Sequence, residues 1–487
     1  MQQLTDAIGA FNDGLFWPLL IVILAVSSIY FSARLGLVQF RLIPDMFRAL
    51  KSGPDSSHEG GKKQSISSFQ AFAISAAGRV GTGNVAGVAT AISVGGPGAV
   101  MWMWIMAMVL GAASFVESTL AQLYKVPHST GFRGGPAYYM QYGLGRRWMG
   151  VLFAITITVT FGFVFNAVQS NTISTTLVGS VGEFGADTDA LPWLPAAIGV
   201  GLVLLTAAVI FGGVKRIANV AQTLVPLMAG LYLLLGIAVV AMNVEKIPGV
   251  IALIVTHAFG IREVAAAGLG TAIIQGVRRG MFSNEAGLGS APNAGATASV
   301  SHPVKQGLVQ TLGVYFDTLV VCSITAFIIL VANPTYGEDL GATMTQDALG
   351  ANLGSWAVHV LTVIIFLLAF TSVLGNYYYG ESNIGFLNSS EKVMTAYKWV
   401  FLLATFLGSI GSIQLVWTLA DTTMGFMALV NLAAIIPLGA VAYKLLKDYL
   451  DQRKQGLDPV FTRDRLPELR NVQCWEARTA ERDSALS

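Results

Sequence analysis

Long apolar runs separated by short polar loops dominate this chain. A helix needs roughly 20 apolar residues to cross a hydrocarbon core about 30 Å thick. Runs of that length predict eleven membrane-spanning helices, at 14–32, 68–95, 98–123, 148–178, 193–212, 218–242, 264–282, 306–332, 356–380, 394–411 and 413–443. Residues 250–260 are too few to span and predict a short interfacial or re-entrant helix. The pattern therefore predicts an all-α polytopic membrane protein.

Two of the predicted spans are interrupted by glycines. Residues 68–95 contain Gly78, Gly81, Gly83 and Gly87, and residues 264–282 contain Gly268, Gly270, Gly276 and Gly280. In a bilayer, non-helical backbone is tolerated only where it is buried in protein or lines a cavity. Four spans separate the two, and broken helices at corresponding positions of two halves are typical of secondary transporters with inverted repeats. We therefore expect one extra N-terminal helix and a core of five plus five, with its first and sixth helices broken.

Lysine and arginine gather in alternate loops. If the first span runs from outside to inside, 26 of the 29 Lys and Arg residues lie in segments on the cytoplasmic side, including six in 33–67 and nine in 444–487. The positive-inside rule then places the N-terminus outside and the C-terminus in the cytoplasm. We expect three regions: residues 1–67 with the first helix and a cytoplasmic loop, a transport core at 68–445, and a flexible cytoplasmic tail at 446–487.

Composition supports this class and excludes others. The chain is 54% hydrophobic and 11% charged, against about 25% charged residues in soluble domains. Its five His residues are scattered, and no Gly-x-Ser-x-Gly, His-Glu-x-x-His or Cys-x-x-Cys motif occurs. An enzyme is therefore not indicated. The expected partners are the lipid bilayer and a small substrate, and nothing implies a nucleic-acid or protein partner.

The first interrupted span carries the densest group of candidate binding residues. The backbone amides of Gly81, Thr82 and Gly83, at the end of a half-helix, suit a substrate carboxylate. The side-chain oxygen of Asn84 suits a cation or a substrate amine. Glycines also allow two helices to pack closely, and close packing is the alternative interpretation of this segment.

Arg79 is the one Lys or Arg that we place at membrane depth. An ionisable residue there indicates a functional role by default, and a structural ion pair or snorkelling is the alternative. Glu117, Asp317 and Asp421 are its candidate partners. Glu117 lies near the inner end of its span and equally suits a gate.

Further polar residues interrupt the apolar spans. Phe165 and Gln169 lie four residues apart on one helix face, where a ligand or a neighbouring helix can satisfy the Gln. Gln275 lies in the second interrupted span, and the turn-rich segment 278–292 after it predicts a cytoplasmic gate or hinge. Thr371 and Ser372 offer hydroxyl ligands for sodium, unless they bond only to their own helix.

Four stretches resemble the alanine or glycine:cation symporter family, also called sodium:alanine symporters: 81–92, 95–104, Gly280-Met-Phe-Ser-Asn-Glu-Ala-Gly-Leu-Gly-Ser-Ala-Pro-Asn-Ala294 and Tyr377-Tyr-Tyr-Gly-Glu381. The resemblance implies eleven spans, the last ten in the inverted-repeat fold of the leucine transporter. It implies that carbonyls near Ala77 and Val80 bind sodium together with Thr371 and Ser372. Asn376 stands where the family pattern has an aromatic residue, which implies a larger or more polar pocket.

These observations together predict a symporter of the cytoplasmic (inner) membrane. Its resemblance implies that it imports alanine or glycine with a sodium ion through alternating access. Proton coupling and exchange are alternatives, and so is an amino-acid-gated channel or sensor. A channel needs a continuous polar pore, whereas the polar residues here concentrate at one depth, which favours a carrier.

Overall fold

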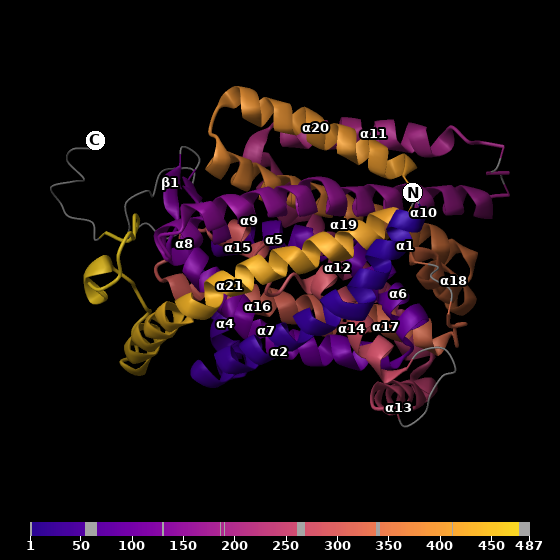
Figure 1. Ribbon diagram of the computed structural model, residues 1–487. Coiled ribbons are helices and arrows are strands. Elements are labelled where there is room, and N and C mark those ends of the chain that lie inside the picture. The colour runs from indigo at the N-terminus through magenta and orange to yellow at the C-terminus, as the bar shows by residue number, and fades with distance from the viewer. Residues whose placement is uncertain are drawn as a thin grey trace.

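The computed structural model describes residues 2–53, 66–128, 131–185, 187–188, 190–260, 268–337, 341–411 and 413–476. Long helices run between two ends of the molecule (Figure 1). In the described part of the chain the one sheet is an antiparallel hairpin of β1, Val126–His128, and β2, Gly131–Arg133. The polytopic helical architecture predicted from hydropathy is therefore confirmed.

Eight helices of the described segments are long and apolar enough to cross a membrane. They are Thr5–Arg34, Gly98–Leu123, Arg147–Glu183, Gly213–Met242, Pro303–Val331, Ser355–Leu387, Glu391–Ile410 and Gln414–Lys454. Gly83–Gly95 and Leu194–Ile210 are shorter apolar helices. The count of eleven spans stays a prediction, because the broken helices are too short to meet a length criterion by themselves.

The helices of the described residues have the following bounds. In the first half they are α1 Gln2–Phe11, η1 Asn12–Phe16, α2 Trp17–Arg34, α3 Val38–Arg41, α4 Ile43–Leu50, α5 Ser68–Arg79, η2 Gly83–Gly87, α6 Val88–Gly95, α7 Gly98–Leu123, α8 Pro136–Tyr142, α9 Arg147–Val159, η3 Thr160–Phe165, α10 Asn166–Glu183 and α11 Leu194–Ile210. In the second half they are α12 Gly213–Met242, η4 Val244–Lys246, α13 Ile247–Ala258, α14 Leu269–Asn284, α15 Ala291–Gly295, α16 Pro303–Tyr315, η5 Phe316–Cys322, α17 Ser323–Val331, α18 Ala342–Leu353, α19 Ser355–Leu387, α20 Glu391–Ile410, α21 Ile413–Lys454 and η6 Arg463–Arg465.

The first interrupted span breaks where the glycines predicted it. A capping box between Ser67 and Gln70 starts α5, because each side chain satisfies a free amide of the first turn. Regular α-helix ends at Arg79, and the chain resumes as the π-helical turn η2 and then α6. All residues from 73 to 93 are buried, so the break lies inside the bundle.

The second break does not lie where we predicted it. Helix α14 is regular through the glycine-rich stretch to Asn284, and the chain then leaves the helix at Glu285, whose φ of 57° is left-handed. Segment 275–301 is buried throughout. Segment 278–292 is therefore part of the buried core and not an exposed loop. Its role as a gate or hinge stays a prediction.

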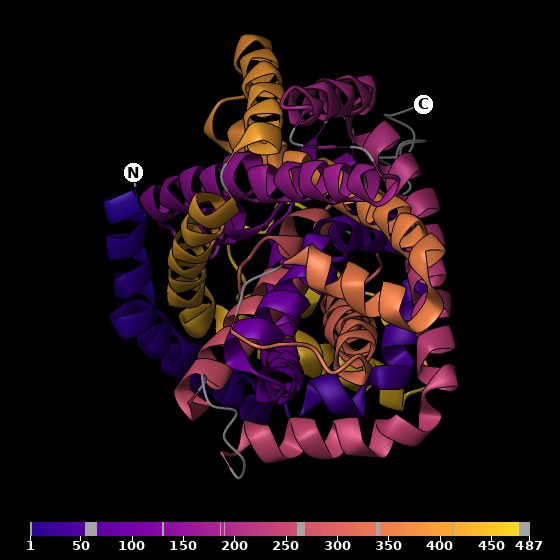
Figure 2. The ribbon, with the colours of Figure 1, turned by 90° about the vertical axis from the view of Figure 1, so that its right-hand side faces the viewer.

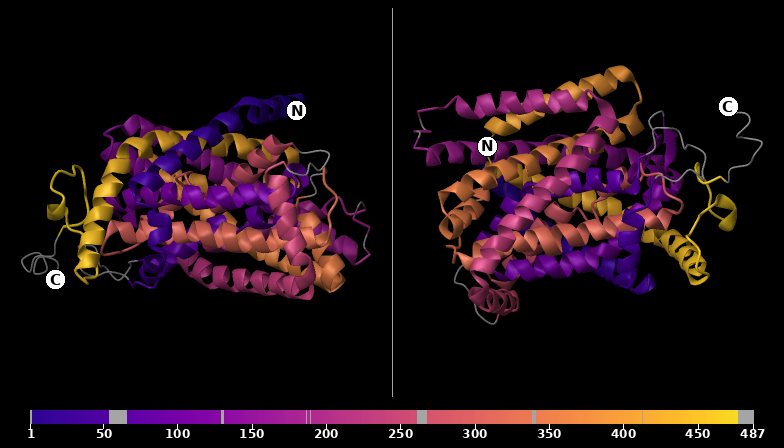
Figure 3. Two further views of the ribbon diagram at one scale, coloured as in Figure 1. Left: turned by 90° about the horizontal axis from the view of Figure 1, so that it is seen from below. Right: turned by 180° about the vertical axis from the view of Figure 1, so that it is seen from behind.

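Loops predicted to face opposite sides gather at opposite ends of the molecule. In Figure 1, β1, α8 and the C-terminal segment lie at the left end, and α13 and α18 lie at the right end. Figure 2 looks onto that right end and shows α13 and α18 lying across it. Figure 3 shows the long helices running between these ends from below and from behind.

The C-terminal segment is folded onto the left end of the bundle. Helix α21 continues past residue 445 to Lys454, and the chain then turns back. Phe461 is 1% exposed and its amide donates to the carbonyl of Ser301 at 2.8 Å. The indole of Trp475 donates to the carbonyl of Gln122. The prediction of a flexible tail is therefore wrong for residues 446–476, and residues 477–487 lie outside the described part.

Candidate functional site

The break in the first interrupted helix frees two backbone carbonyls. The amide of Gly81 donates to Oδ1 of Asn84 at 2.9 Å, whereas in a regular helix it would bond to the carbonyl of Ala77. The amide of Asn84 donates to the carbonyl of Gly81 at 3.2 Å. In a regular helix it would instead donate to the carbonyl of Val80. The carbonyls of Ala77 and Val80 therefore lose their usual helical donors and become available to a cation.

The amide of Thr82 faces a side chain of the fourth predicted span. It donates to Oε1 of Gln169 on α10 at 3.2 Å, and both residues are buried. The Thr82 hydroxyl is buried and has no hydrogen-bond partner. A backbone amide that already binds a side-chain oxygen is a preformed donor, and a carboxylate oxygen can take the place of the amide oxygen of Gln169.

Thr371 and Ser372 lie beside this break on α19. A Cβ at Gly81 would overlap the Ser372 hydroxyl, so only glycine lets the two helices approach this closely. Both hydroxyls donate to the carbonyl of Leu368, at 2.9 and 3.1 Å, which leaves their oxygen lone pairs as acceptors. The structure therefore brings Ser372 to Gly81, one residue after the freed carbonyl of Val80.

Asp317 joins the two broken helices. It is fully buried in the π-helical turn η5 and accepts hydrogen bonds from Nδ2 of Asn84 and from the Ser283 hydroxyl, each at 2.7 Å. Thr318 donates a third bond at 3.1 Å. Asn84 belongs to the first broken helix and Ser283 lies one residue before the end of α14. One carboxylate therefore bonds to side chains from both breaks.

Glu117 holds the second break in place from α7. Its two carboxylate oxygens accept from the amides of Gly287 and Gly289 at 3.2 and 3.1 Å, and Asn431 of α21 donates to it at 2.7 Å. These are amides that a regular helix would satisfy internally. Glu117 therefore bonds to the unwound backbone, and it does not pair with Arg79.

Arg79 points away from the freed amides. It is 2% exposed, and its Nη1 donates to the backbone carbonyl of Gln310 on α16 at 3.1 Å. Its Nε and Nη2 have no hydrogen-bond partner, and no ion pair joins it to Glu117, Asp317 or Asp421 in the described residues. Its positive charge lies at the C-terminal end of α5, where it stabilises the helix dipole.

Two arginines that were counted among the loop charges are buried within a helix. Arg278 and Arg279 lie within α14, are 4% and 3% exposed, and both contact Asp421 of α21. Arg278 also pairs with Asp13 at 2.5 Å. Asp421 is therefore the partner of Arg278 and Arg279, and both arginines leave the count of loop charges.

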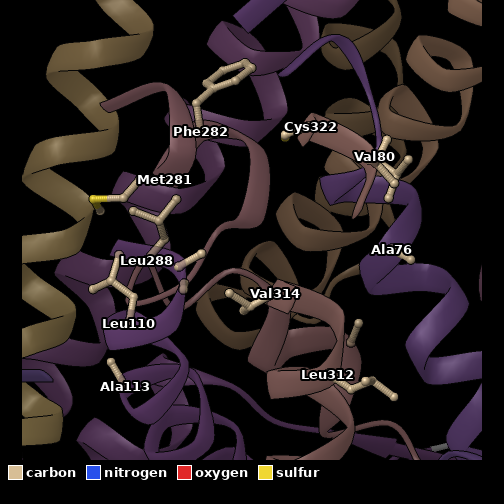
Figure 4. Close-up of a cluster of buried hydrophobic side chains, with 14 of the residues drawn as sticks. Ala76, Val80, Leu110, Ala113, Met281, Phe282, Leu288, Leu312, Val314 and Cys322 are labelled. Carbon is tan, nitrogen blue, oxygen red and sulfur yellow. The ribbon is translucent and has the colours of Figure 1, made fainter. Parts of the chain in front are cut away.

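Aromatic rings cover the space between the first break and this ion-pair cluster. The ring centroids of Phe165 and Phe282 are 4.5 Å apart, and those of Phe282 and Trp417 are 4.8 Å apart. The guanidinium of Arg279 stacks on Trp417 at 4.6 Å. Figure 4 shows Phe282 and Val80 in the buried cluster that links the two broken helices.

Two predicted site residues have contrasting positions. Gln275 packs against Gly95, at the far end of α6 from Gly81, and so the structure does not bring it to the group around the break. Asn376 lies one helical turn after Ser372 on α19. It is 1% exposed, and neither atom of its carboxamide has a hydrogen-bond partner.

The structure thus brings most of the predicted residues together around the first break. They are Ala77, Val80, Gly81, Thr82, Gly83, Asn84, Phe165, Gln169, Thr371 and Ser372. Sequence reasoning missed the role of Asp317, which it named only as a partner for Arg79, and missed Ser283. A lone carboxylate within an apolar span was the available signal for Asp317.

Comparison with known proteins assigns the family. A model of the sodium:alanine symporter family matches residues 1–463. The chain belongs to the sodium:alanine symporter family. It is 50% identical to the probable sodium/glutamine symporter GlnT of Bacillus subtilis, over 99% of both chains. It is 51% identical to the amino-acid carrier protein AlsT of the same organism, over 99% of this chain and 100% of AlsT. It is 35% identical to the sodium/alanine symporter AgcS of Methanococcus maripaludis, over 93% of this chain and 99% of AgcS.

A solved structure identifies the fold class. MhsT, whose crystal structure is in complex with L-phenylalanine, matches with a TM-score of 0.58 at 12% identity, covering 79% of this chain and 99% of MhsT. The fold is therefore that of the leucine-transporter type, as the family resemblance implied. Members of the family are transporters, so this multi-pass membrane protein is a sodium-coupled amino-acid symporter and not an enzyme.

Proposed function

We propose that this symporter imports small neutral amino acids, alanine or glycine among them, and binds substrate and sodium on opposite sides of the first helix break. The observation that carries the proposal is the bonding of the Gly81 and Thr82 amides to the side-chain oxygens of Asn84 and Gln169. Donors and freed carbonyls then face different directions at one buried point. That arrangement suits a carboxylate and a cation at once.

Sodium binds the carbonyls of Ala77 and Val80 with the hydroxyl oxygens of Thr371 and Ser372. All four groups are hard oxygen donors, which small cations of this kind prefer. The close approach of Gly81 to Ser372 supports the proposal, because it holds α19 against the break. Asp317 supplies the negative charge for a second cation or for the substrate ammonium, through the position it shares with Asn84 and Ser283.

The substrate carboxylate displaces Gln169 from the Thr82 amide, and the amide of Gly83 adds a further donor. Asn376 faces the substrate side chain. On α19, Asn376 lies between Ser372 and Tyr379. Ser372 lies against Gly81, and the ring of Tyr379 lies 5.1 Å from that of Phe161. A buried carboxamide without partners costs free energy unless a ligand or water satisfies it. Asn376 therefore extends the range of substrates to neutral side chains that form hydrogen bonds, and the relation to a probable glutamine symporter supports this.

The finer architecture follows the same proposal. Eleven spans comprise an extra N-terminal helix and a five-plus-five inverted repeat, in which α5–α6 and α14–α15 are the broken first and sixth core helices. The protein lies in the cytoplasmic membrane with its N-terminus outside. The gathering of the basic loops at one end of the molecule supports this orientation.

Coupling arises because substrate and sodium share one broken helix. Sodium binding fixes the carbonyl side of the break and thereby the amides that receive the carboxylate. Each ligand raises the affinity for the other by the same coupling free energy. The cover of Phe282, Trp417 and the Arg279–Asp421 pair closes one side of the site, and movement of the two broken helices opens the other.

Uptake into proteoliposomes tests the proposal. Radiolabelled alanine or glycine must accumulate when sodium is higher outside, and must not accumulate in choline or with equal sodium on both sides. Counterflow without a sodium gradient separates exchange from symport. Flux that follows the membrane potential without saturating in amino acid would contradict a carrier.

A further inference from the structure

A cavity of about 180 Å³, lined by both polar and apolar side chains, lies at the end of the bundle that carries β1 and α8, separate from the site at the helix break. Its lining includes Ile66, His128, Arg133, Thr297, Tyr378 and Glu381. Pockets for drug-sized ligands have about 300–1,000 Å³. This smaller cavity therefore suits a metabolite of the size of a single amino acid.

The cavity adjoins both broken helices on one side of the membrane. Ile66 precedes α5, and Thr297 follows α15, which continues the second broken helix. A hydrogen bond from the amide of Ser299 to the carbonyl of Ile66 joins these two chain segments. Glu381 follows Ser372 by nine residues on α19, which is about 14 Å along a helix. The cavity thus lies where a substrate leaving the break toward this end would arrive.

The cavity contains two opposite charges that do not pair with each other. The guanidinium of Arg133 lies against Gly385, one helical turn after Glu381 on the same face of α19. No ion pair forms between Arg133 and Glu381 among the described residues, and Oε2 of Glu381 is buried without a hydrogen-bond partner. Burial and the positive charge of Arg133 lower the pKa of His128 to about 4. His128 is therefore neutral at pH 7 and adds no second positive charge.

A ligand that carries both charges matches this arrangement. An anion alone would bind Arg133 but would be repelled by the carboxylate of Glu381. A cation alone would bind Glu381 but would be repelled by Arg133. We propose that the cavity is a second binding site for a zwitterionic amino acid, with its carboxylate on Arg133 and its ammonium on Glu381. The inference rests on the proposed transport function. It adds a second substrate-binding site between the helix break and the aqueous phase at this end.

Sided transport measurements test this second site. In proteoliposomes sorted for orientation, the half-saturating alanine concentration is measured separately from each side for wild type, R133Q and E381Q. In R133Q and E381Q, which each lose one charged contact, we expect the half-saturating alanine concentration from the cavity side to rise about tenfold. We expect the half-saturating concentration from the opposite side to stay unchanged. R133K keeps the positive charge and is expected to stay close to wild type.

Two variants at the same end serve as controls. Arg147 and Glu391 are a cation and an acid outside the cavity lining, and R147Q and E391Q are expected to leave both values unchanged. The second site is refuted if R133Q and E381Q change neither value, or change both by the same factor. If wild type itself does not accumulate amino acids with sodium, the proposed function fails instead, so the two failures are distinguishable.

Discussion

Nδ2 of Asn84 donates a hydrogen bond of 2.7 Å to Asp317, and both side chains are fully buried. Asn84 is at the same time the acceptor for the Gly81 amide. The carboxylate on η5 therefore sets the orientation of the carboxamide that holds the helix break open. The negative charge of Asp317 therefore acts on the amides and carbonyls of the break through the side chain of Asn84.

Replacing Asp317 tests the role of this charge. D317N keeps the size of the side chain, and removes a charged acceptor whose hydrogen bonds are worth about 1.5–3 kcal/mol. We expect the half-saturating sodium concentration for alanine uptake to rise by about 10- to 100-fold. T318A removes one donor to the same carboxylate but keeps the charge, and we expect only a small change. Equal sodium dependence of D317N and wild type would contradict a role in cation binding.

Ser372 gives an independent test of the sodium site. S372A removes one proposed ligand and leaves the helix otherwise intact, so we expect the half-saturating sodium concentration to rise about fivefold, in keeping with the loss of about 1 kcal/mol. Ser409 on α20 is also buried and also bonds to a carbonyl of its own helix, at 3.1 Å. S409A is therefore a matched control. Sodium dependence that changes equally in both variants would place the effect in helix packing.

The first break was predictable from sequence, and the second was not. Four glycines with Asn84 inside one apolar span mark a point where backbone leaves the helix. In 264–282, Gly276 has another use, because a Cβ there would overlap the carbonyl of Ala99 on α7. This glycine allows close packing in a regular helix. The second unwound segment is held by Glu117, which is about 170 positions earlier in the chain, and no local pattern reveals such a partner.

Polarity alone also misjudged charged segments. Arg278 and Arg279 read as loop residues because two adjacent arginines in an apolar span are costly. The structure offsets this cost with Asp421 and with the rings of Trp17 and Trp417. The tail reads as flexible because it is polar on average, yet Phe461 and Trp475 are 1% and 2% exposed. These contacts join positions far apart in sequence.

Asn376 tests the choice of substrate. N376L keeps the volume of the side chain and removes both polar atoms. A glutamine side chain that binds there would lose its partner, which costs about 1–3 kcal/mol. In competition assays against labelled alanine, we expect glutamine to inhibit N376L about 5- to 100-fold less strongly than wild type. Alanine has no polar side chain, so its own uptake is the control and is expected to persist. An unchanged ratio of glutamine to alanine affinity would exclude Asn376 as the determinant.

The cluster around Asp421 predicts a difference between two aspartates that pair with the same arginine. Asp421 and Arg278 are both buried, whereas the Asp13 side chain is 61% exposed. Removing one partner of a buried pair costs about 3–5 kcal/mol, and an exposed pair contributes about 0–1 kcal/mol. D421N is therefore expected to lower the thermal unfolding midpoint in detergent strongly, and D13N only slightly. The Arg279–Asp421 pair is also part of the proposed cover of the site, together with Phe282. At a temperature where D421N is still folded, we therefore expect bound substrate to exchange faster in D421N than in D13N. Equal unfolding midpoints for the two variants would show that Asp421 is not the main partner of these arginines.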